Sequence, residues 1–363
     1  MLKKISIIAF FIISFALNAK ILMQPYLQAV SMNDIFVMVE TDSKQNVEIT
    51  YWDNENQQMT KTSRFYLQTT AINPITYVHR INLDNLKPET KYSYKAKQED
   101  SESKIYQFNS ACINGASYLV GVAGDNRSNP KIFGKVAGKL LSKNPSFCLF
   151  NGDLCGDSSY YRWKSEFFIP SLLNLASTTP FFNAVGNHEG WVQNTKAFTQ
   201  APASKSENQE YYSFEYGDAL YVILSTEHVI RKGSDQYNFL ENILKTNKKT
   251  WKFIVFHKSA YVGGGDGVYR PMQKVATELF KKYNVTMAIS GHSHFYQHNV
   301  VDGINHLTMG GAGAPLYDFK TESYTVKSVK AYHYGILEVT PIKVKMTVYD
   351  LEDKVLDIIE VTK

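Results

Sequence analysis

The sequence predicts a layered α/β domain, with mixed β-sheets flanked by helices, preceded by a small all-β sandwich domain. Residues 24–110 show no long helical periodicity and indicate short strands joined by turns rich in Asp, Asn, Pro and Ser. From Ser117 onward, apolar strand-like runs alternate with amphipathic segments that have helical spacing. The tail beyond Gly335 returns to strands, which favours antiparallel additions to a mixed sheet.

The predicted domain bounds are 1–19 for a signal peptide, 20–110 for the sandwich and 111–363 for the α/β domain. The signal peptide is expected because a basic start precedes the apolar run 5–17, and the small residue Ala19 follows. An uncleaved membrane anchor is the alternative. Cleavage after Ala19 predicts a secreted or periplasmic protein.

The individual elements follow from periodicity and from turn residues. In the sandwich the predicted strands are 35–41, 47–52, 78–83, 92–97 and 105–109. The predicted strands of the α/β domain are 118–123, 147–150, 181–185, 211–216, 219–224, 251–256, 285–289, 335–339, 344–349 and 355–361. Its predicted helices are 131–142, 160–175, 236–244 and 272–283, and Gly217-Asp218 predicts a hairpin turn.

Charge and cysteine content exclude some classes of function. The net charge is +5, and the lysines are scattered rather than clustered, so no nucleic-acid partner is expected. Three cysteines are too few for a disulfide framework. Cys148 and Cys155 straddle a strand end, where an extended chain holds them too far apart to pair. We expect free, mostly buried thiols.

Five short polar blocks come directly after, or at the end of, five predicted strands. A single Gly-Asp after a strand is an ordinary turn, but α/β sheets place their sites at the carboxyl ends of strands. As candidate site groups the blocks supply two carboxylates (Asp125 and Asp153), one amide (Asn187) and four imidazoles, which suit a two-metal hydrolytic centre. The blocks are Gly124-Asp125-Asn126-Arg127, Asn151-Gly152-Asp153, Gly186-Asn187-His188-Glu189, Val255-Phe256-His257 and Gly291-His292-Ser293-His294.

The order of these blocks resembles the calcineurin-like metallophosphoesterase superfamily, and within it the purple acid phosphatase-like branch. The resemblance covers essentially the whole mature chain, including the Gly-rich segment 310–315 and the ending at Val355-Leu356-Asp357. In the sandwich, the passage 81–94 is similar to the strand-corner-strand segment of fibronectin type III-like domains, in which a Tyr packs the corner.

The resemblance implies two metal ions, from among Fe, Mn and Zn, that activate a hydroxide for attack on a phosphate ester. His188 would assist the leaving group rather than bind metal. The implied ligands are Asp125 and His294 for one ion, Asn187, His257 and His292 for the other, and Asp153 as the bridge between them.

Two positions depart from the family pattern. Most of the superfamily has His two residues after the first Asp, where this chain has Arg127. The purple branch instead uses a Tyr three residues after the bridging Asp, where this chain has Gly156, so no purple tyrosinate-to-iron colour is expected. Arg127 is open to three interpretations. It binds the substrate phosphate, it forms a structural ion pair, or the first site is weak, empty or rescued by Cys155 or Asp157.

The sequence therefore predicts a metal-dependent phosphoric ester hydrolase, foremost a phosphomonoesterase acting on a small phosphate ester. A phosphodiesterase or nucleotidase with the same metals is one alternative, and a non-catalytic binding protein with a degenerate metal site is another. Other candidates for contacts near the centre are His228, Tyr296, His298 and His306, for which ordinary packing or surface exposure is at least as good an explanation.

Overall fold

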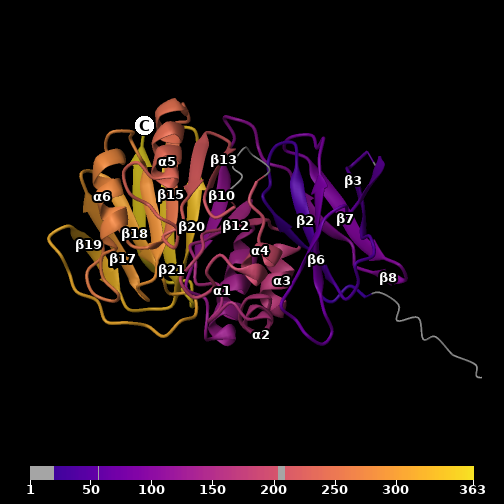
Figure 1. Ribbon diagram of the computed structural model, residues 1–363. Helices are drawn as coiled ribbons and strands as arrows, with labels where there is room; N and C mark the ends of the chain where they lie inside the picture. Colours follow the sequence, from indigo (N-terminus) through magenta and orange to yellow (C-terminus); the bar gives the residue numbers. More distant parts are fainter. Residues whose placement is uncertain (1–19, 56, 203–208) are drawn as a thin grey trace, which may run out of the picture.

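The computed structural model describes residues 20–55, 57–202 and 209–363, and it shows an α/β domain beside a β-sandwich (Figure 1). The predicted signal peptide, residues 1–19, lies outside these described residues. No helix within the described ranges is long and apolar enough to cross a membrane. The mixed α/β class with an all-β amino-terminal part is confirmed.

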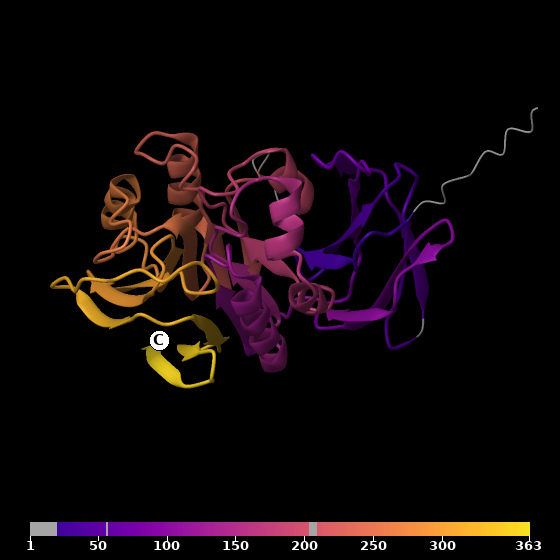
Figure 2. The same cartoon turned by 90° about the horizontal axis from the view of Figure 1, so that it is seen from below.

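The largest sheet runs the length of the molecule, from the carboxyl-terminal strands at one end to the sandwich at the other (Figures 1 and 2). Its strands β10, β11 and β12 are parallel, whereas β20, β21 and β22 add antiparallel, as the sequence predicts. In spatial order the described strands are β22 (Val355–Thr362), β21 (Lys343–Asp350), β20 (His333–Val339), β10 (Tyr118–Ala123), β11 (Phe147–Phe150), β12 (Phe181–Asn183), β1 (Tyr26–Gln28), β2 (Ile35–Thr41), β6 (Tyr77–Leu83) and β5 (Tyr66–Gln68).

A second sheet packs face to face on the first. The ring of Phe147 in β11 meets the ring of Tyr221 in β14 edge-on, with centroids 5.2 Å apart, so aromatic side chains fill the space between the sheets. In spatial order its described strands are β13 (Tyr212–Tyr216), β14 (Ala219–Ile223), β15 (Trp251–Lys258), β16 (Met287–Gly291), β18 (Ile304–Met309), β17 (Tyr296–Val301) and β19 (Thr325–Val329).

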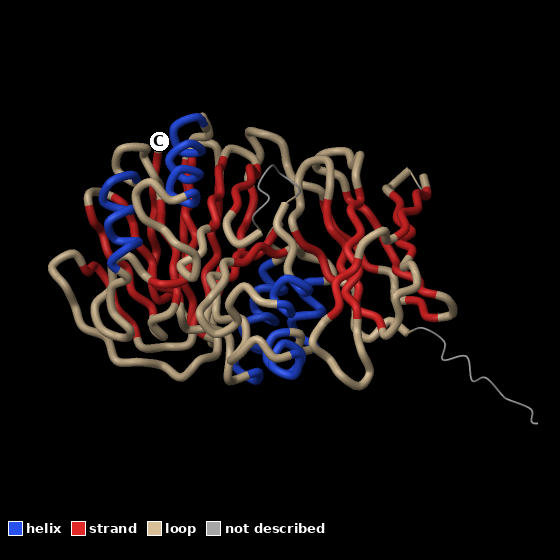
Figure 3. The backbone as a smooth tube through the Cα atoms, viewed as in Figure 1, coloured by secondary structure: helices blue, strands red, loops and turns tan. Residues whose placement is uncertain are grey.

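Helices cover the outer faces of this pair of sheets in two separate groups (Figure 3). Phe133 of α1 packs on Phe150 of β11, whereas Leu240 of α5 and Leu279 of α6 pack in a cluster with strands of the second sheet. One group contains α1 (Pro130–Lys143), α2 (Tyr160–Arg162), α3 (Pro170–Ala176) and α4 (Gln193–Phe198), and the other contains α5 (Asp235–Thr246) and α6 (Arg270–Leu279).

The predicted helix 160–175 is wrong, because the segment is broken. A π-helical turn, Trp163–Phe167, separates α2 from α3, and Pro170 begins the next helix. Proline has no N–H to donate and disfavours helical backbone in the residue before it, so a new helix starts there. The predicted helix 131–142 is confirmed as α1, where the Asn129 side chain accepts from the Ile132 N–H.

The sandwich has its own smaller sheet, which faces β2 and β6. The Lys87 N–H donates to the buried Tyr92 hydroxyl at 2.9 Å, so a Tyr holds the corner as predicted. The fibronectin type III-like assignment itself stays a prediction. The described strands of this sheet are β4 (Gln58–Thr62), β3 (Glu48–Trp52), β7 (Lys91–Gln98) and β8 (Ser101–Glu102), with β9 (Tyr106–Asn109) paired to β7.

The sequence did not predict that the two domains share a sheet. Strand β1 pairs parallel with β12, with Gln28 opposite Phe181, and antiparallel with β2. The Tyr26 hydroxyl and the Gln28 side-chain amide both donate to the Phe198 carbonyl, at 2.9 and 3.2 Å. Hydrogen bonds therefore run without interruption from the sandwich into the α/β domain, and the bounds 20–110 and 111–363 stay a prediction.

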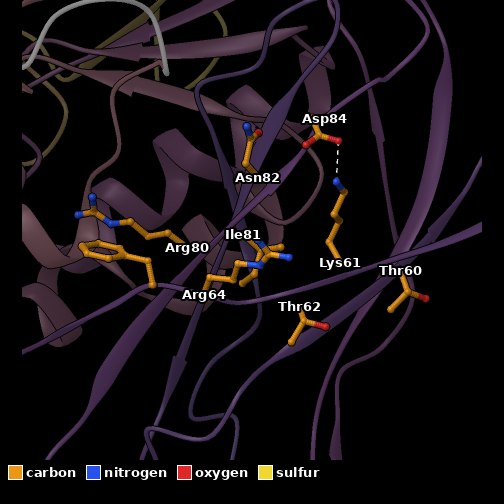
Figure 4. A pocket seen from close by; sticks show the side chains of 9 residues that line it. Thr60, Lys61, Thr62, Arg64, Arg80, Ile81, Asn82 and Asp84 are labelled. Carbon is orange, nitrogen blue, oxygen red and sulfur yellow. Dashed lines mark hydrogen bonds and ion pairs between the residues drawn. The ribbon is translucent and has the colours of Figure 1, made fainter.

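A groove of about 560 Å³ opens on the sandwich (Figure 4). Lys61 and Asp84 pair at 2.7 Å on one of its walls, and the guanidinium of Arg80 lies over the ring of Phe65. Arg64 also lines the groove and is exposed. The groove contains no member of the candidate metal-ligand groups described below.

The three cysteines are free, as predicted, with Cys148 and Cys155 buried and Cys112 partly buried. The hairpin at Gly217 is also confirmed, since β13 and β14 pair antiparallel across it.

Asp357 of β22 links the two sheets through a partly buried polar network. Its Oδ2 accepts from the Tyr296 hydroxyl at 2.7 Å and lies 3.2 Å from Nδ1 of His298. Burial alone would raise the pKa of Asp357, but the hydrogen bonds from His298 and Tyr296 outweigh burial and lower it. Because the folded-state pKa is depressed, the stabilisation is present above the unfolded value and is lost as pH falls.

We expect Asp357→Asn to lower the free energy of unfolding by about 1–3 kcal/mol at pH 7. The difference in free energy of unfolding between Asp357→Asn and wild type should decrease as pH falls below about 4, where the wild-type carboxylate itself gains a proton. Urea denaturation at both pH values measures the difference, with the exposed Asp318→Asn as the control. Equal stability of Asp357→Asn and wild type at pH 7 would show that the network is not stabilising.

Candidate metal centre

The five polar blocks lie together at the carboxyl ends of strands, as predicted. Asp125, Asp153 and Asn187 follow β10, β11 and β12 of the first sheet. His257 is the penultimate residue of β15, and His292 follows β16 in the second sheet. The loops of both sheets therefore meet at one edge of the molecule's central core.

Three of the candidate ligands have a left-handed backbone conformation. Asp125, Asp153 and His292 have φ angles of 55°, 53° and 69°. For residues with a Cβ this conformation costs about 1–2 kcal/mol each, and it recurs at functional sites where the surrounding structure enforces it. Gly124 and Gly291 permit the close approach of these loops. A Cβ at Gly124 would lie 1.1 Å from Asn151 Oδ1, and one at Gly291 would lie 2.2 Å from Asp125 Oδ2.

One half of the centre, called the Asn187 half, consists of Asp153, Asn187, His257 and His292. The Asn187 Oδ1, the Asp153 Oδ1 and the His292 Nδ1 lie 3.1, 3.1 and 3.3 Å from His257 Nε2. Four atoms with lone pairs thus converge on one small volume, which fits a cation with mixed oxygen and nitrogen ligands such as Fe, Mn or Zn.

The electrostatics of the Asn187 half also favour a cation. Burial opposes the charged form of the His257 imidazole, but the adjacent Asp153 carboxylate outweighs burial and raises the pKa of His257 to about 10. A proton on His257 therefore balances the buried carboxylate. Metal binding requires a neutral imidazole, so an ion bound in this half would displace that proton.

Neighbouring groups fix the orientation of these side chains. His257 Nδ1 lies 3.0 Å from the Asn151 carbonyl, which leaves Nε2 facing the centre. Glu189 is buried and accepts from the N–H groups of Gly186 and Leu154, at 2.7 and 3.2 Å. Glu189 thereby ties the Asp153 loop to the Asn187 loop. Its place in the Gly-Asn-His-Glu block was the only sequence signal for this role.

His188 lies beside the Asn187 half rather than in it. Its Nδ1 is 2.7 Å from the Gly156 carbonyl, and its Nε2 is 3.8 Å from Asp153 Oδ2. The side chain is about 31% exposed, so solvent or a substrate can reach Nε2. This position leaves His188 able to exchange a proton with a substrate, and its catalytic role stays a prediction.

The other half of the centre, called the Asp125 half, consists of Asp125, Asp153 and His294. Their candidate ligand atoms lie within 4.8 Å of one another, and all three residues are buried. Both Asp125 oxygens accept from the His292 N–H, at 3.0 and 2.9 Å. His294 Nδ1 lies 2.8 Å from the Pro315 carbonyl, so Nε2 turns toward Asp125 Oδ1 at 3.5 Å.

Arg127 reaches into the Asp125 half. Its Nε donates to Asp153 Oδ2 at 3.1 Å, and its Nη2 lies 3.4 Å from His294 Nε2. The predicted ion pair of Arg127 is thus confirmed in geometry, with Asp153 as its partner. Contact with substrate phosphate stays a prediction.

Tyr317 is a residue of this centre that the sequence did not predict. Its ring stacks on the His294 imidazole with centroids 4.0 Å apart, and its N–H donates to the His294 carbonyl at 3.0 Å. Burial raises the pKa of Tyr317, and the nearby Arg127 guanidinium opposes that rise. Only its closeness in sequence to the Gly-rich segment 310–315 could have indicated this position.

The two halves therefore fit a metal ion unequally. The Asn187 half offers four ligands, whereas the Asp125 half offers three and also holds a guanidinium. Cys155 donates its thiol hydrogen to the Asp157 carbonyl, and neither residue belongs to the ligand groups found among the described residues. A Cβ at Gly156 would meet Glu166 Oε2 at 3.1 Å, so a carboxylate stands where the side chain of a Tyr at position 156 would begin.

The other histidine and tyrosine candidates do not join the centre. Tyr296 and His298 belong to the Asp357 network. His306 is buried and packs against Tyr261 and Phe280. His228 is partly exposed and lies 3.0 Å from a Glu210 oxygen. None of the four is part of a ligand group among the described residues.

Sequence comparison finds similarity between part of this chain and a known family. Residues 118–296 match the calcineurin-like phosphoesterase family. Probable inactive purple acid phosphatase 1 of Arabidopsis thaliana is 27% identical over 333 residues, which cover 73% of this chain and 54% of that protein. Phosphoenolpyruvate phosphatase of Allium cepa is 26% identical over 301 residues, which cover 73% of this chain and 60% of that protein. The chain spans about half the length of the curated relatives it matches.

Solved structures show the same fold. Purple acid phosphatase PPD1 from yellow lupin (Lupinus luteus) seeds superposes with a TM-score of 0.83 at 20% identity, covering 93% of this chain and 74% of that one. PhoD superposes with a TM-score of 0.69 at 12% identity, covering 94% and 90%. Residues 118–296 therefore match the calcineurin-like phosphoesterase family, in a chain that is similar to purple acid phosphatases in sequence and in fold.

Proposed function

We propose that the protein is a metal-dependent phosphoric ester hydrolase that prefers monoesters. The observation that carries the proposal is the convergence of Asp153, Asn187, His257 and His292 beside a partly exposed His188. The match to the calcineurin-like phosphoesterase family supports the same reaction class. Export to the periplasm or the cell exterior is part of the proposal and rests on the sequence of residues 1–19.

When bound, a metal ion in this centre supplies positive charge to the phosphoryl group and lowers the pKa of the attacking water. The residues that would hold it are those of the Asn187 half, with Asp125 and His294 as the further ligands that the family fold implies. The side chains themselves provide no nucleophile in this scheme, so their task is to bind, orient and transfer protons.

His188 would give its proton to the leaving oxygen. In either protonation state its Nδ1 keeps a hydrogen for the Gly156 carbonyl, so Nε2 is the atom that gains and loses a proton. The His188 N–H also donates to Asp153 Oδ1 at 3.1 Å, which fixes the backbone beside the bridging carboxylate. The proton on Nε2 passes to the ester oxygen as its bond to phosphorus breaks.

Arg127 would bind the substrate phosphate. Its Nε donates to Asp153, and its Nη1 and Nη2 lie 3.3 Å from Ser128 Oγ and 3.4 Å from His294 Nε2, so two of the five N–H groups of the guanidinium remain, one on each terminal nitrogen. The hydrogens that remain can form a fork toward two phosphate oxygens. A fixed positive charge at this place favours the dianion of a monoester over the single charge of a diester.

A non-catalytic metal-binding protein is the second candidate function. It is favoured by one observation, which is that several relatives carry the name probable inactive purple acid phosphatase. Both candidates bind metal, so turnover separates them. Purified protein that has been loaded with metal should hydrolyse an aryl phosphate monoester and lose that activity on chelation. Full metal loading without turnover of any phosphate ester would instead favour the non-catalytic candidate.

We expect His188→Ala to lower kcat on the order of 10²-fold for an alkyl phosphate, because the poor leaving group needs a proton. The loss should be smaller for 4-nitrophenyl phosphate, whose leaving group is stable as an anion, and KM should change little for both. Steady-state kinetics on the two esters measure the difference. Equal losses on both esters would contradict a proton-donor role for His188.

A further inference from the structure

We infer that the guanidinium of Arg127 occupies the first metal position, so that the centre holds one metal ion, in the Asn187 half, and one built-in organic cation. The role of this arrangement in catalysis rests on the proposed function, but the position of the guanidinium and the number of metal ions do not. It replaces the dinuclear centre that the family fold implies with a centre of one metal ion and one arginine.

The guanidinium uses the lone pairs that a metal ion in the Asp125 half would need. Because His294 Nδ1 faces the Pro315 carbonyl, the lone pair of His294 is on Nε2, and Arg127 Nη2 approaches that atom at 3.4 Å. Arg127 Nε donates a hydrogen bond to Asp153 Oδ2 at 3.1 Å. Two of the three ligands in this half therefore already contact a cation.

Asp153 divides its two oxygens between the halves. Oδ1 lies 3.1 Å from His257 Nε2 in the Asn187 half, whereas Oδ2 accepts from Arg127. In a two-metal centre a bridging carboxylate gives one oxygen to each ion. Here the same carboxylate bridges the complete metal site and a guanidinium, which takes the place of the second ion in the bridge.

Arg127 supplies one fixed positive charge beside the two buried carboxylates of the Asp125 half. The side chains of Asp125 and Asp153 are essentially inaccessible to solvent, and buried carboxylates need a nearby positive charge. A guanidinium remains protonated at all ordinary pH values and has no lone pair for a metal. A divalent ion entering this half would face a fixed positive charge among its own ligands, so the guanidinium excludes the ion.

Tyr317 and Ser128 lie around the guanidinium. The Tyr317 ring stacks on His294, whose Nε2 lies 3.4 Å from Arg127 Nη2. The Ser128 hydroxyl lies 3.3 Å from Arg127 Nη1. The Arg127 side chain is only 14% exposed, so it is packed among these partners rather than extended into solvent.

The customary ligands that this chain lacks also belong to the Asp125 half. Position 156 is a glycine, so no Tyr side chain can bind an ion there, and the thiol of Cys155 donates to the Asp157 carbonyl. The loss of both customary ligands and the gain of a guanidinium therefore affect one half of the centre only. A substrate phosphate would lie between the metal ion of the Asn187 half and the Arg127 fork.

Metal stoichiometry tests the inference without reference to activity. Metal-stripped full-length protein is titrated with Zn²⁺ and, separately, with Mn²⁺ by calorimetry, and bound metal per chain is measured after gel filtration. Wild type should bind one equivalent of either ion tightly. Arg127→His, which removes the guanidinium and supplies the customary imidazole, should bind two, and its Mn²⁺ form should show the exchange-coupled resonance of a metal pair.

Arg64→Ala in the sandwich groove is the matched control and should bind one equivalent, like wild type. Arg127→Ala provides a second route if Arg127→His fails to fold, and it should bind a second equivalent with lower affinity than Arg127→His.

Two equivalents in wild type would overturn the inference, as would no tight binding at all. One equivalent in both Arg127 variants would also overturn it, because the guanidinium would then not be what excludes the ion. One equivalent in wild type and two in Arg127→His supports the inference even if no phosphate ester is hydrolysed. Failure of the proposed function and failure of this inference are therefore separate results.

Discussion

We expect His257→Ala to lower kcat/KM for an aryl phosphate monoester on the order of 10³-fold. His257 Nε2 lies at the point where Asp153, Asn187 and His292 converge, so its removal takes away the central ligand of the complete half. The loss should appear mainly in kcat, because the metal ion stabilises charge that develops during phosphoryl transfer.

His228→Ala is the matched control for this substitution. His228 is a partly exposed histidine outside the ligand groups of the described residues, so its removal should leave kcat/KM within a few-fold of wild type. Circular dichroism and the melting temperature of the metal-free proteins show whether each variant folds. A folded His257→Ala variant that keeps substantial activity would contradict the assignment of the metal site.

The second large effect is expected from Asp153→Asn, which removes the negative charge of the side chain and keeps its shape. Asp153 contacts His257 on one side and Arg127 on the other, so its charge holds both halves of the centre. Burial alone would raise the pKa of Asp153, but His257 outweighs burial and keeps the pKa well below its usual value. Asp153 is therefore ionised at neutral pH and ready to bind a cation.

We expect Asp153→Asn to lower kcat/KM on the order of 10³-fold and to abolish the stabilisation by metal. Metal at a thousand times its Kd should stabilise wild type by about 4 kcal/mol, because it binds the folded state only. Thermal melts with and without Zn²⁺ measure this, with Asp84→Asn in the sandwich as a control that retains the metal effect. An undiminished metal effect in Asp153→Asn would show that the ion binds elsewhere.

The candidate ligands could be predicted because they follow strands. The carboxyl ends of strands meet at one edge of an α/β layer, so the loops that carry Asp125, Asp153, Asn187 and His292 were expected near one another, and the family resemblance implied these residues as the ligands. His257 was expected just after a strand and is instead the penultimate residue of β15. This difference does not change the site, because a residue at the carboxyl end of the strand lies at the same edge of the sheet as one directly after it.

The partners of Arg127 could not be predicted, because they depend on side-chain packing. Arg127 and Asp153 are 26 residues apart, and Tyr317 comes from a loop of the other sheet. The family resemblance indicated that Arg127 stands where a ligand is customary, and it left phosphate binding, an ion pair and a weakened metal site as open interpretations. Contact with Asp153 and His294 is what distinguishes the guanidinium as an occupant of the Asp125 half.

The join between β1 and β12 and the break at Trp163–Phe167 had no clear sequence signal. β1 is three residues long, and its partner lies more than 150 residues away, so only tertiary packing selects the pairing. The π-helical turn carries Glu166, whose buried carboxylate accepts from the Gly156 N–H at 2.6 Å. A regular helix periodicity could not reveal that local requirement.

The most direct test of the central claim is a matrix of metals against substrates. Metal-stripped protein is reloaded with Fe, Mn, Zn or Mg and assayed on an aryl phosphate monoester and the matching diester across pH. A metal-dependent monoesterase predicts no turnover without metal, turnover restored by Fe, Mn or Zn, and faster hydrolysis of the monoester. Hydrolysis that survives a strong chelator, or no hydrolysis of either ester with any metal, would contradict it.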